Sequence, residues 1–313
     1  MSLFLIILLM IIGFVMLIYG GNLMVDASLR FSKNTGISTA MVGATLVSII
    51  TTLPEFLVSV FSTGQGATEL AVGNVMGSLI FNFFIVIGVM LLFSKQIQNP
   101  MGFVSKIALA LICLITLLIF GLDGQVTLAE GLIFLFIFIY YMVSQITCAK
   151  KEQFEAPHVN KSYKPWADIA VAVFGAILIA VGARLVVDNG IALGQTLMIP
   201  EHIIGLTIIA VGTSLPEFVT CVISIRKKAI GLSIGNILGT LIMNITLLMG
   251  TNALLTGGML HISEEVAYLI IPMLTMGMVL FGLPLVKKKQ FSVWQGVLFI
   301  SIAIAYYIYA IFI

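Results

Sequence analysis

Two glutamates are the residues whose type and position best suit chemistry. Glu55 and Glu217 each follow a proline inside a long apolar stretch. A charged carboxylate at the centre of a membrane costs about 3 kcal/mol or more, so a carboxylate retained there is expected to be functional. Pro54 and Pro216 have no N–H, so carbonyl oxygens one turn earlier lose a hydrogen-bond partner. These carbonyls belong to Ile50 and Thr51 in the first stretch and to Gly212 and Thr213 in the second.

Carboxylate and freed carbonyl oxygens are the ligands that a hard cation prefers. We therefore expect each Pro-Glu pair to contribute to a cation site inside the membrane. The alternative is that each pair is a structural kink beside a protonated glutamic acid.

A stripe of polar residues follows each Pro-Glu pair on the next apolar stretch. Its members, spaced four residues apart, are Asn74, Ser78 and Asn82 in one case and Asn236, Thr240 and Asn244 in the other. Steps of four drift by only about 40° around a helix, so each trio lines one face. The stripes are either cation ligands or contacts that hold helices together. For Asn74 and Asn236 both interpretations stay open.

Glycine pairs accompany both stripes. Gly73 and Gly77 lie beside the first stripe, and Gly235 and Gly239 beside the second. A Gly-x-x-x-Gly pair leaves a flat helix surface, so we expect another helix to approach closely at each.

The two blocks form an internal repeat. Residues 205–217 match residues 43–55, and residues 235–244 match residues 73–82, with one offset of 162 residues. The same offset relates Asp26 to Asp188, which are expected to be vestibule residues or helix caps. A repeated unit with an odd number of spans is inverted in the membrane. Inverted repeats are typical of secondary transporters, whose substrate site lies near the bilayer midplane.

The composition indicates which elements position these residues. Of 313 residues, 60% are hydrophobic and 9% are charged, against about 25% charged in soluble domains, which excludes a soluble enzyme. Mean hydropathy is +1.19. Since a span needs roughly 20 apolar residues, we predict ten helices near residues 3–31, 38–63, 68–94, 100–121, 126–147, 165–193, 201–225, 229–256, 264–285 and 290–311. The fold class expected is therefore an all-α integral membrane protein built as two inverted five-helix repeats, residues 1–147 and 165–313, joined by a linker at 148–164.

The basic residues predict the orientation. Fourteen of the fifteen Lys and Arg residues lie in or beside alternate loops. By the positive-inside rule these loops and the linker are cytoplasmic, so both termini are extracellular and the chain spans the cytoplasmic membrane. The exception is Arg184, which we expect to pair with Asp188 one turn later. The apolar N-terminal stretch lacks a basic region before it and an obvious cleavage site, so a retained helix is expected rather than a signal peptide.

The other candidate residues indicate little chemistry. Three cysteines, Cys113, Cys148 and Cys221, are expected to be buried free thiols because their number is odd and they have no metal-binding spacing. The histidines, His158, His202 and His261, are expected in surface loops. A net charge of +2 indicates no nucleic-acid partner, and no protein partner or cofactor is evident. Neither H-E-x-x-H nor a nucleophile with a base is present, so an enzyme is not expected.

The paired blocks resemble the alpha repeats of the cation/calcium exchanger superfamily, which includes prokaryotic sodium/calcium exchangers. The resemblance is carried by residues 212–217 with 235–239, and by residues 51–55 with 73–78. It implies the ten-helix exchanger fold, in which short broken helices enclose cation sites and helices 1 and 6 slide to alternate access. It also implies an antiporter that moves Ca²⁺, usually outward, against inward Na⁺.

The resemblance further implies the site residues. Glu55 and Glu217 would be the central Ca²⁺ ligands, with the carbonyls of Thr51 and Thr213. Asn82 and Asn244 would occupy the middle positions. Oxygens of flanking Na⁺ sites would come from Ser78 and Thr240, the backbone near Ser48 and Ala210, and the side chains of Thr51 and Thr213. Thr52 and Ser214 complete the expected set.

Two departures from the family pattern matter. Ile50 stands where the second repeat has Gly212, which makes the first turn bulkier. Asn244 stands where many sodium/calcium exchangers carry an aspartate, so the matched positions hold only two acids, with a total charge of −2 when both are ionised. One Ca²⁺, two Na⁺ or two protons neutralise this charge, whereas a third Na⁺ leaves a positive charge in a low-dielectric site.

Three alternatives remain. A Ca²⁺/H⁺ antiporter would use the same two glutamates as proton carriers. A passive cation channel is the second, although one carboxylate in each inverted repeat argues for a closed central site. A membrane protease or lipid transferase is the third, and it lacks the motifs named above.

Overall fold

The structure is a computed structural model that describes residues 3–93, 101–155, 162–196, 210–287 and 292–312. In the first half the helices are α1 (Leu3–Thr35), α2 (Thr39–Val42), η1 (Gly43–Val47), α3 (Ser48–Gly64), α4 (Thr68–Ile80), η2 (Phe81–Val86), α5 (Ile87–Phe93), α6 (Met101–Gly121) and α7 (Leu128–Glu155). In the second half they are α8 (Pro165–Thr196), α10 (Ala210–Thr213), α11 (Leu215–Arg226), α12 (Ile230–Met243), η4 (Asn244–Leu248), α13 (Met249–Leu255), η5 (Val266–Ile270), α14 (Ile271–Lys287) and α15 (Val293–Phe312). The η segments are π-helices, and most continue directly from one α-helix into the next.

The spans agree with those predicted from the apolar runs. Within the described ranges nine helices are long and apolar enough to cross a membrane. The span expected at 201–225 is described only from Ala210, as α10 and α11. One boundary differs clearly, because α7 continues to Glu155 and so extends into the segment expected as the linker. His158 and His202, and the first half of the block 205–217, lie outside the described residues.

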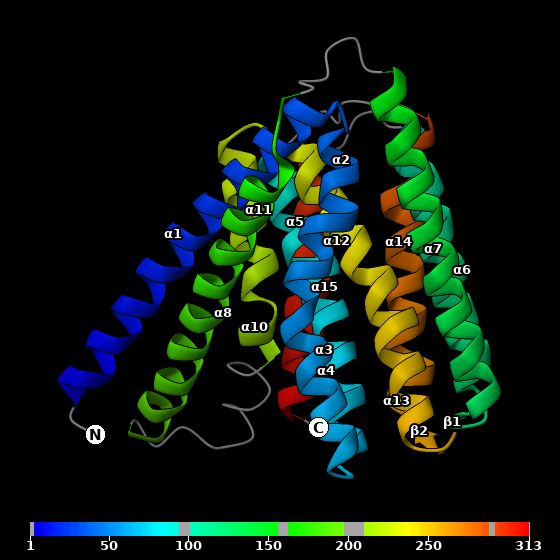
Figure 1. Cartoon of the computed structure of the whole chain (residues 1–313). Helices are drawn as coiled ribbons and strands as arrows, with labels where there is room; N and C mark the ends of the chain where they lie inside the picture. Colours follow the sequence, from blue (N-terminus) through cyan, green and yellow to red (C-terminus); the bar gives the residue numbers. More distant parts are fainter. Residues whose placement is uncertain (1–2, 94–100, 156–161, 197–209, 288–291, 313) are drawn as a thin grey trace.

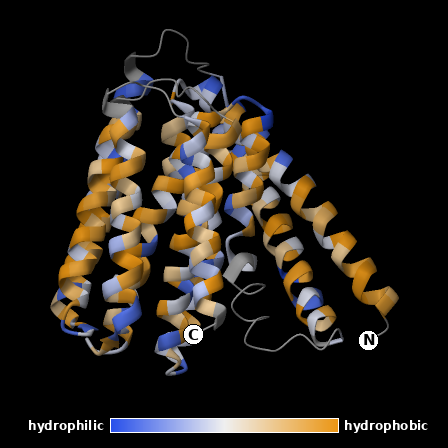
Figure 2. Cartoon of the chain, turned by 180° about the vertical axis from the view of Figure 1, so that it is seen from behind, coloured by the Kyte–Doolittle hydropathy of each residue, from blue (hydrophilic) through white to orange (hydrophobic). Residues whose placement is uncertain are grey.

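The two ends of the molecule differ in charge. Figure 1 shows both termini at one end, which we call the terminal end. The same end holds Gln65, just after α3, and Glu69, in the first turn of α4. The opposite end, the basic end, holds Lys33, Lys151 and Lys227 at the ends of α1, α7 and α11. Figure 2 shows hydrophobic residues along the lengths of the outer helices and hydrophilic residues at the ends. This distribution is the one that a bilayer-spanning bundle requires.

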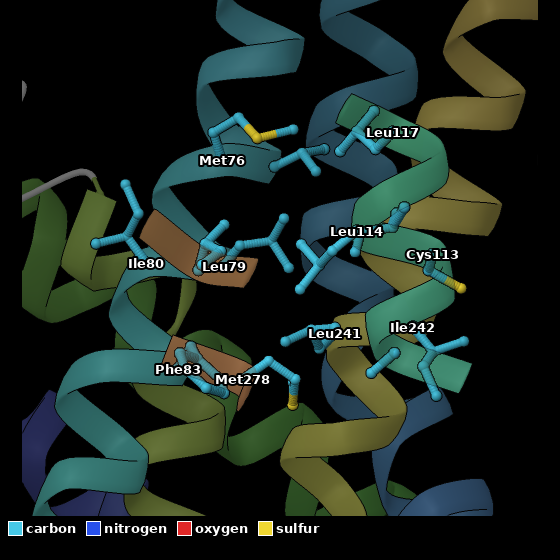
Figure 3. Close-up of a cluster of buried hydrophobic side chains, with 14 of the residues drawn as sticks. Met76, Leu79, Ile80, Phe83, Cys113, Leu114, Leu117, Leu241, Ile242 and Met278 are labelled. Carbon is cyan, nitrogen blue, oxygen red and sulfur yellow. The ribbon is translucent and has the colours of Figure 1, made fainter. Parts of the chain in front are cut away.

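The centre of the bundle consists of α4 with η2 and α5, and of α12 with η4 and α13. In these two spans 78% and 94% of the most apolar window is buried, against 22% in α1. Figure 3 shows how the centre packs: Met76, Leu79 and Phe83 face Leu114 and Leu117 of α6, with Leu241, Ile242 and Met278 completing the cluster. The polar stripes therefore lie on helices that protein, not lipid, surrounds.

The helices α1 and α8 form a separate, tilted pair beside this centre (Figure 1). They cross at glycines: a Cβ on Gly20 would lie 2.5 Å from the carbonyl oxygen of Gly175, and a Cβ on Gly13 would lie 2.8 Å from that of Gly182. Gly13 and Gly20 correspond to Gly175 and Gly182 by the repeat offset of 162 residues, so each contact is the repeat counterpart of the other. The pair is thus packed backbone to backbone about the pseudo-twofold axis that relates the repeats.

The glycine pair beside the second polar stripe packs tightly against the first half of the chain. A Cβ on Gly235 would lie 2.2 Å from the carbonyl oxygen of Ala40, and one on Gly239 would lie 2.6 Å from Ser48 Oγ. Close helix approach is therefore confirmed in the second half. At Gly73 a Cβ would meet no described atom within 4 Å. The repeat counterpart of Ala40 is residue 202, which lies outside the described residues, so close approach in the first half stays a prediction.

Several local features depart from or extend the expectations. A two-residue sheet, β1 (Gln125–Val126) with β2 (Leu260–His261), joins the halves at the terminal end, and exposed His261 lies in it. Cys113 and Cys221 are buried as expected, but Cys148 is exposed, because α7 carries it beyond the packed bundle. The expected pair of Arg184 and Asp188 is present at 3.5 Å.

Candidate cation-binding site

Four helical segments, two from each half, meet around one buried centre. Within the halves, α3 packs on α4 and α11 packs on α12. Between the halves, α3 packs on α12 and α10 packs on α4. Each Pro-Glu segment therefore contacts the polar stripe of both repeats.

Glu55 on α3 and Glu217 on α11 are both fully buried at this centre. The two carboxyl groups are close enough to interact directly with each other, and the Glu55 carboxyl group also lies close to the hydroxyl of Ser78. Within the described residues none of the four carboxyl oxygens has a partner with full hydrogen-bond geometry, although the hydroxyls of Ser78 and Thr51 lie close to Glu55 and Glu217 respectively. Buried carboxyl oxygens without donors are rare in proteins, because each costs desolvation energy that nothing offsets.

The amides of Asn82 and Asn244 complete the ring of oxygens. Both Nδ2 atoms donate to the hydroxyl oxygen of Ser78, each at 3.1 Å. Their Oδ1 atoms are buried and have no partner. The centre thus contains carboxyl and amide oxygens from both halves that lack protein donors, which is the ligand chemistry of Ca²⁺ and Na⁺.

Two hydrogen bonds between the repeats hold α3 against α12. Thr51 Oγ1 donates to Asn236 Oδ1 at 3.1 Å, and Thr52 Oγ1 donates to Thr240 Oγ1 at 3.2 Å. Asn236 therefore acts as a helix contact in the structure. Asn74 does the same within the first half, because its Nδ2 donates to the carbonyl oxygen of Glu55 at 3.3 Å.

The two Pro-Glu segments differ in backbone conformation, although their sequences match. In the second half the helix stops at Ser214, which has φ −97° and ψ 5°, and Pro216 lies in the first turn of α11. There the missing N–H of proline has no helical cost. In the first half α3 continues through Pro54 without a break. The broken helix that the resemblance implies is therefore present in the second half, at Ser214, and absent from α3 in the first half. Pro54 still offers no N–H to the carbonyl oxygen of Ile50, so the expected free carbonyl does not require a break there.

The remaining predicted residues lie around this centre. Ser214, in the break, is buried and its hydroxyl has no partner. Thr213, the last residue of α10, is half-buried and lines a cavity. Ser48 is buried, and its hydroxyl donates to Thr45 O at 3.2 Å. Ala210 begins α10, two turns before Glu217 along the chain.

A cavity of about 640 Å³ reaches this region from the side of α8. It is lined by Pro54 of α3, by Gly212 and Thr213 of α10, and by Pro216 of α11. Arg184 and Asp188 of α8 lie on its outer wall. Gln65 at the terminal end also lines it, so the cavity connects the proline residues beside both glutamates with that end of the molecule.

The sequence did not predict the π-helices, or that Tyr141 binds to one of them. Asn82 lies in η2 and Asn244 lies in η4. Such π-helical segments widen a helix and occur often at functional sites. In η1 the carbonyl oxygen of Ala44 accepts a 2.6 Å hydrogen bond from Tyr141 of α7, which is fully buried. Only the burial of a tyrosine hydroxyl in an apolar helix could have hinted at this contact.

A transition-metal site is not formed in the described part of the chain, where no three His, Cys, Asp or Glu side chains gather. The oxygen set at the centre is instead typical of hard cations. The fold is that of a membrane transporter with two inverted repeats, a class whose substrate site lies where the repeats meet.

Comparison with known proteins identifies the family. The sodium/calcium exchanger protein family matches residues 5–147 and 168–312, so the chain belongs to this family. It is 29% identical to the putative antiporter CaxA of Alkalimonas amylolytica, over 95% of both chains. It is 24% identical to the sodium/calcium exchanger MaX1 of Methanosarcina acetivorans, over 96% of both chains.

A solved structure agrees with the fold. The sodium-calcium exchanger NCX_Mj, soaked with 10 mM Na⁺ and zero Ca²⁺, superposes with a TM-score of 0.83 at 27% identity, over 97% of this chain and 98% of that chain. The expected all-α exchanger fold with two repeats is thereby confirmed. The chain is a multi-pass membrane protein of an antiporter family.

Proposed function

We propose that this chain is a secondary antiporter that moves Ca²⁺ outward across the cytoplasmic membrane in exchange for inward Na⁺. One observation carries the proposal: Glu55 and Glu217, one from each half, are fully buried near each other, and among the described residues no cationic side chain or well-formed hydrogen bond balances either carboxyl group. A divalent cation supplies the missing positive charge. The names of the relatives, sodium/calcium exchangers, support Ca²⁺ and Na⁺ as its ions.

The ligand roles follow from the positions of the oxygens. Glu55 and Glu217 bind Ca²⁺, with the carbonyls of Thr51 and Thr213. Flanking Na⁺ ions use Ser78 and Thr240, with the backbone near Ser48 and Ala210 and the side chains of Thr51, Thr213, Thr52 and Ser214. The middle position is formed by Asn82 and Asn244. Their partnerless Oδ1 atoms support this assignment, since an amide oxygen is a good ligand for a hard cation.

The charge of the site limits the coupling ratio. Only two acids contribute, so the ligand set holds −2 when both are ionised. One Ca²⁺ or two Na⁺ neutralise it, and the proposed cycle therefore carries no net charge. A third Na⁺ would leave an unpaired positive charge in a site that excludes water.

A Ca²⁺/H⁺ antiporter is the second candidate. It is favoured by the same count, since two protons also neutralise the site. The residue Asn244 also favours it. An acid at this position would balance the charge of a third monovalent cation, whereas the neutral amide leaves a site that two protons are enough to neutralise. In this version Glu55 and Glu217 take up protons when Ca²⁺ leaves.

The proposed orientation places the basic end in the cytoplasm. Lys33, Lys151 and Lys227 then face the side where positive residues accumulate. Both termini are extracellular, the linker 148–164 is cytoplasmic, and residues 1–147 and 165–313 are the two inverted repeats. The cavity beside Pro54 and Pro216 then opens toward the extracellular side.

The experiment is ⁴⁵Ca²⁺ uptake into proteoliposomes that contain the purified chain. Vesicles loaded with Na⁺ at constant pH are compared with vesicles loaded with acid without Na⁺, and each is diluted into buffer without the gradient ion. We expect uptake that requires the Na⁺ gradient. Uptake driven by the pH gradient alone would establish the second candidate instead, and uptake under neither gradient would overturn both.

A further inference from the structure

The α1–α8 pair contacts the rest of the bundle differently at its two ends. At the basic end Asp168 accepts a hydrogen bond from Arg30 at 2.7 Å, which ties the start of α8 to the end of α1. With the glycine crossings at Gly13 and Gly20, this ion pair makes α1 and α8 one rigid unit. What matters for access to the site is how this unit meets α3 and α11, which carry the glutamates.

At the basic end the unit is closed against α11. A Cβ on Gly21 of α1 would lie 2.5 Å from Ile223 Cδ1 and 2.6 Å from Val219 Cγ1. One turn further, Lys227 Nζ lies 2.6 Å from Asp26 Oδ1. Ile223 is only 5% exposed, so this contact leaves no passage between α1 and α11.

The repeat offset identifies the same contact at the other end. Gly21 corresponds to Ala183, and Val219 and Ile223 correspond to Leu57 and Phe61. Asp26 and Lys227 correspond to Asp188 and Gln65. All five counterparts, Ala183, Leu57, Phe61, Asp188 and Gln65, line the 640 Å³ cavity.

Among the described residues, the contact that is closed at the basic end is therefore open at the terminal end. Phe61 is 64% exposed, whereas its counterpart Ile223 is 5% exposed. The charge pattern also differs, because Gln65 cannot form an ion pair with Asp188. Asp188 instead faces Arg184 on its own helix at 3.5 Å.

We infer that Asp26 and Lys227 form an ionic latch that holds the basic end closed and has no charged counterpart at the terminal end. The latch joins the α1–α8 unit to α11, the helix of Glu217, so opening of the site toward the basic end must break it. Because the described residues form this latch at the basic end and none at the terminal end, the chain favours the state that is open at the terminal end. The inference deepens the proposed antiport function, which requires both states.

The test measures how accessible Ile223 is from water. Cys113, Cys148 and Cys221 are replaced by serine, Ile223→Cys is introduced, and labelling by a membrane-impermeant maleimide is timed in unsealed proteoliposomes. Asp26→Asn is expected to raise the labelling rate about two- to fivefold, the range expected when one partly exposed ion pair is lost. The exchanged pair, Asp26→Lys with Lys227→Asp, is expected to restore the slow rate.

Asp188→Asn is the matched control, since it changes the equivalent residue at the unlatched end and is expected to leave labelling of Ile223→Cys unchanged. An unchanged rate in Asp26→Asn, or a fast rate in the exchanged pair, would overturn the latch, provided that both variants remain monodisperse with the parent melting temperature. Labelling does not depend on transport. A latch effect in a protein without gradient-driven ⁴⁵Ca²⁺ uptake would therefore reject the antiport proposal and keep the latch.

Discussion

Asn244 donates a hydrogen bond to the hydroxyl of Ser78, in the other half of the chain, at 3.1 Å. Asn82, one turn after Ser78 in the same half, donates to the same oxygen, so Ser78 lies between the two amides. The geometry leaves the Oδ1 atoms of both asparagines free at the centre of the membrane. A neutral amide thus occupies a position where a carboxylate would raise the charge of the proposed site from −2 to −3.

Asn244→Asp is expected to make exchange sensitive to voltage. A set of three carboxylates is neutralised by three Na⁺ but not by one Ca²⁺, so the exchange of these ions moves net charge. ⁴⁵Ca²⁺ uptake at membrane potentials set with K⁺ and valinomycin measures this directly. The wild type is expected to show little voltage dependence, and Asn34→Asp, which adds the same charge near the end of α1, serves as the control. Equal voltage dependence in all three proteins would contradict the proposed charge count.

Glu55→Gln and Glu217→Gln are each expected to abolish gradient-driven ⁴⁵Ca²⁺ uptake. Glutamine keeps the size of the side chain but removes one of only two negative charges that balance Ca²⁺. The residual rate should fall to that of empty vesicles. Glu69→Gln, on an exposed residue at the terminal end, is the matched control and should keep the wild-type rate. Retained uptake in either central variant would mean that its carboxylate is a structural group.

Gly20→Ala is expected to destabilise the protein by about 1–3 kcal/mol. The added Cβ would lie 2.5 Å from the backbone of Gly175, which must then move. Thermal unfolding in detergent measures the loss. Gly73→Ala adds the same methyl group at a position where no described atom lies within 4 Å, so helix propensity should raise stability by up to about 1 kcal/mol. A similar response of both variants would show that the α1–α8 crossing is not tightly packed.

Tyr141→Phe is expected to lower stability by about 1–2 kcal/mol, because the Ala44 carbonyl loses a buried 2.6 Å hydrogen bond in the π-helix η1. Tyr140→Phe removes the hydroxyl of the adjacent tyrosine, which is 66% exposed, and should change little. Melting temperatures of the two variants, measured in one detergent, provide the comparison. Equal melting temperatures would mean that water or another donor replaces the lost bond.

Apolar runs and the repeat were sufficient to predict most of the fold. Helix boundaries in a membrane protein depend on local hydrophobicity, and the turns end at glycines such as Gly36 and Gly66, whose φ values of 75° and 80° other residues rarely adopt. The burial of Glu55 and Glu217 also follows from sequence, since charged residues in apolar spans avoid lipid.

The conformational difference between the halves could not be predicted in this way. Both contain Leu-Pro-Glu, yet only the second helix breaks. One difference depends on a neighbour distant in sequence: a Cβ at Gly212 would lie 2.0 Å from Val187 Cγ2 of α8, whereas the first half has Ile50 at this position. Hydrogen bonds such as Thr51 to Asn236 likewise depend on packing between helices 185 residues apart.

These distances along the chain have a consequence for biosynthesis. Thr51 and Thr52 find their partners 185 and 188 residues later, and Ser78 meets Asn244 only 166 residues after it is made. While the ribosome is still producing the second half, the inserted first half holds Glu55 and these hydroxyls in the bilayer without their final neighbours. The network of Thr51, Thr52 and Ser78 can therefore close only after residue 244 has been inserted, late in the synthesis of the chain.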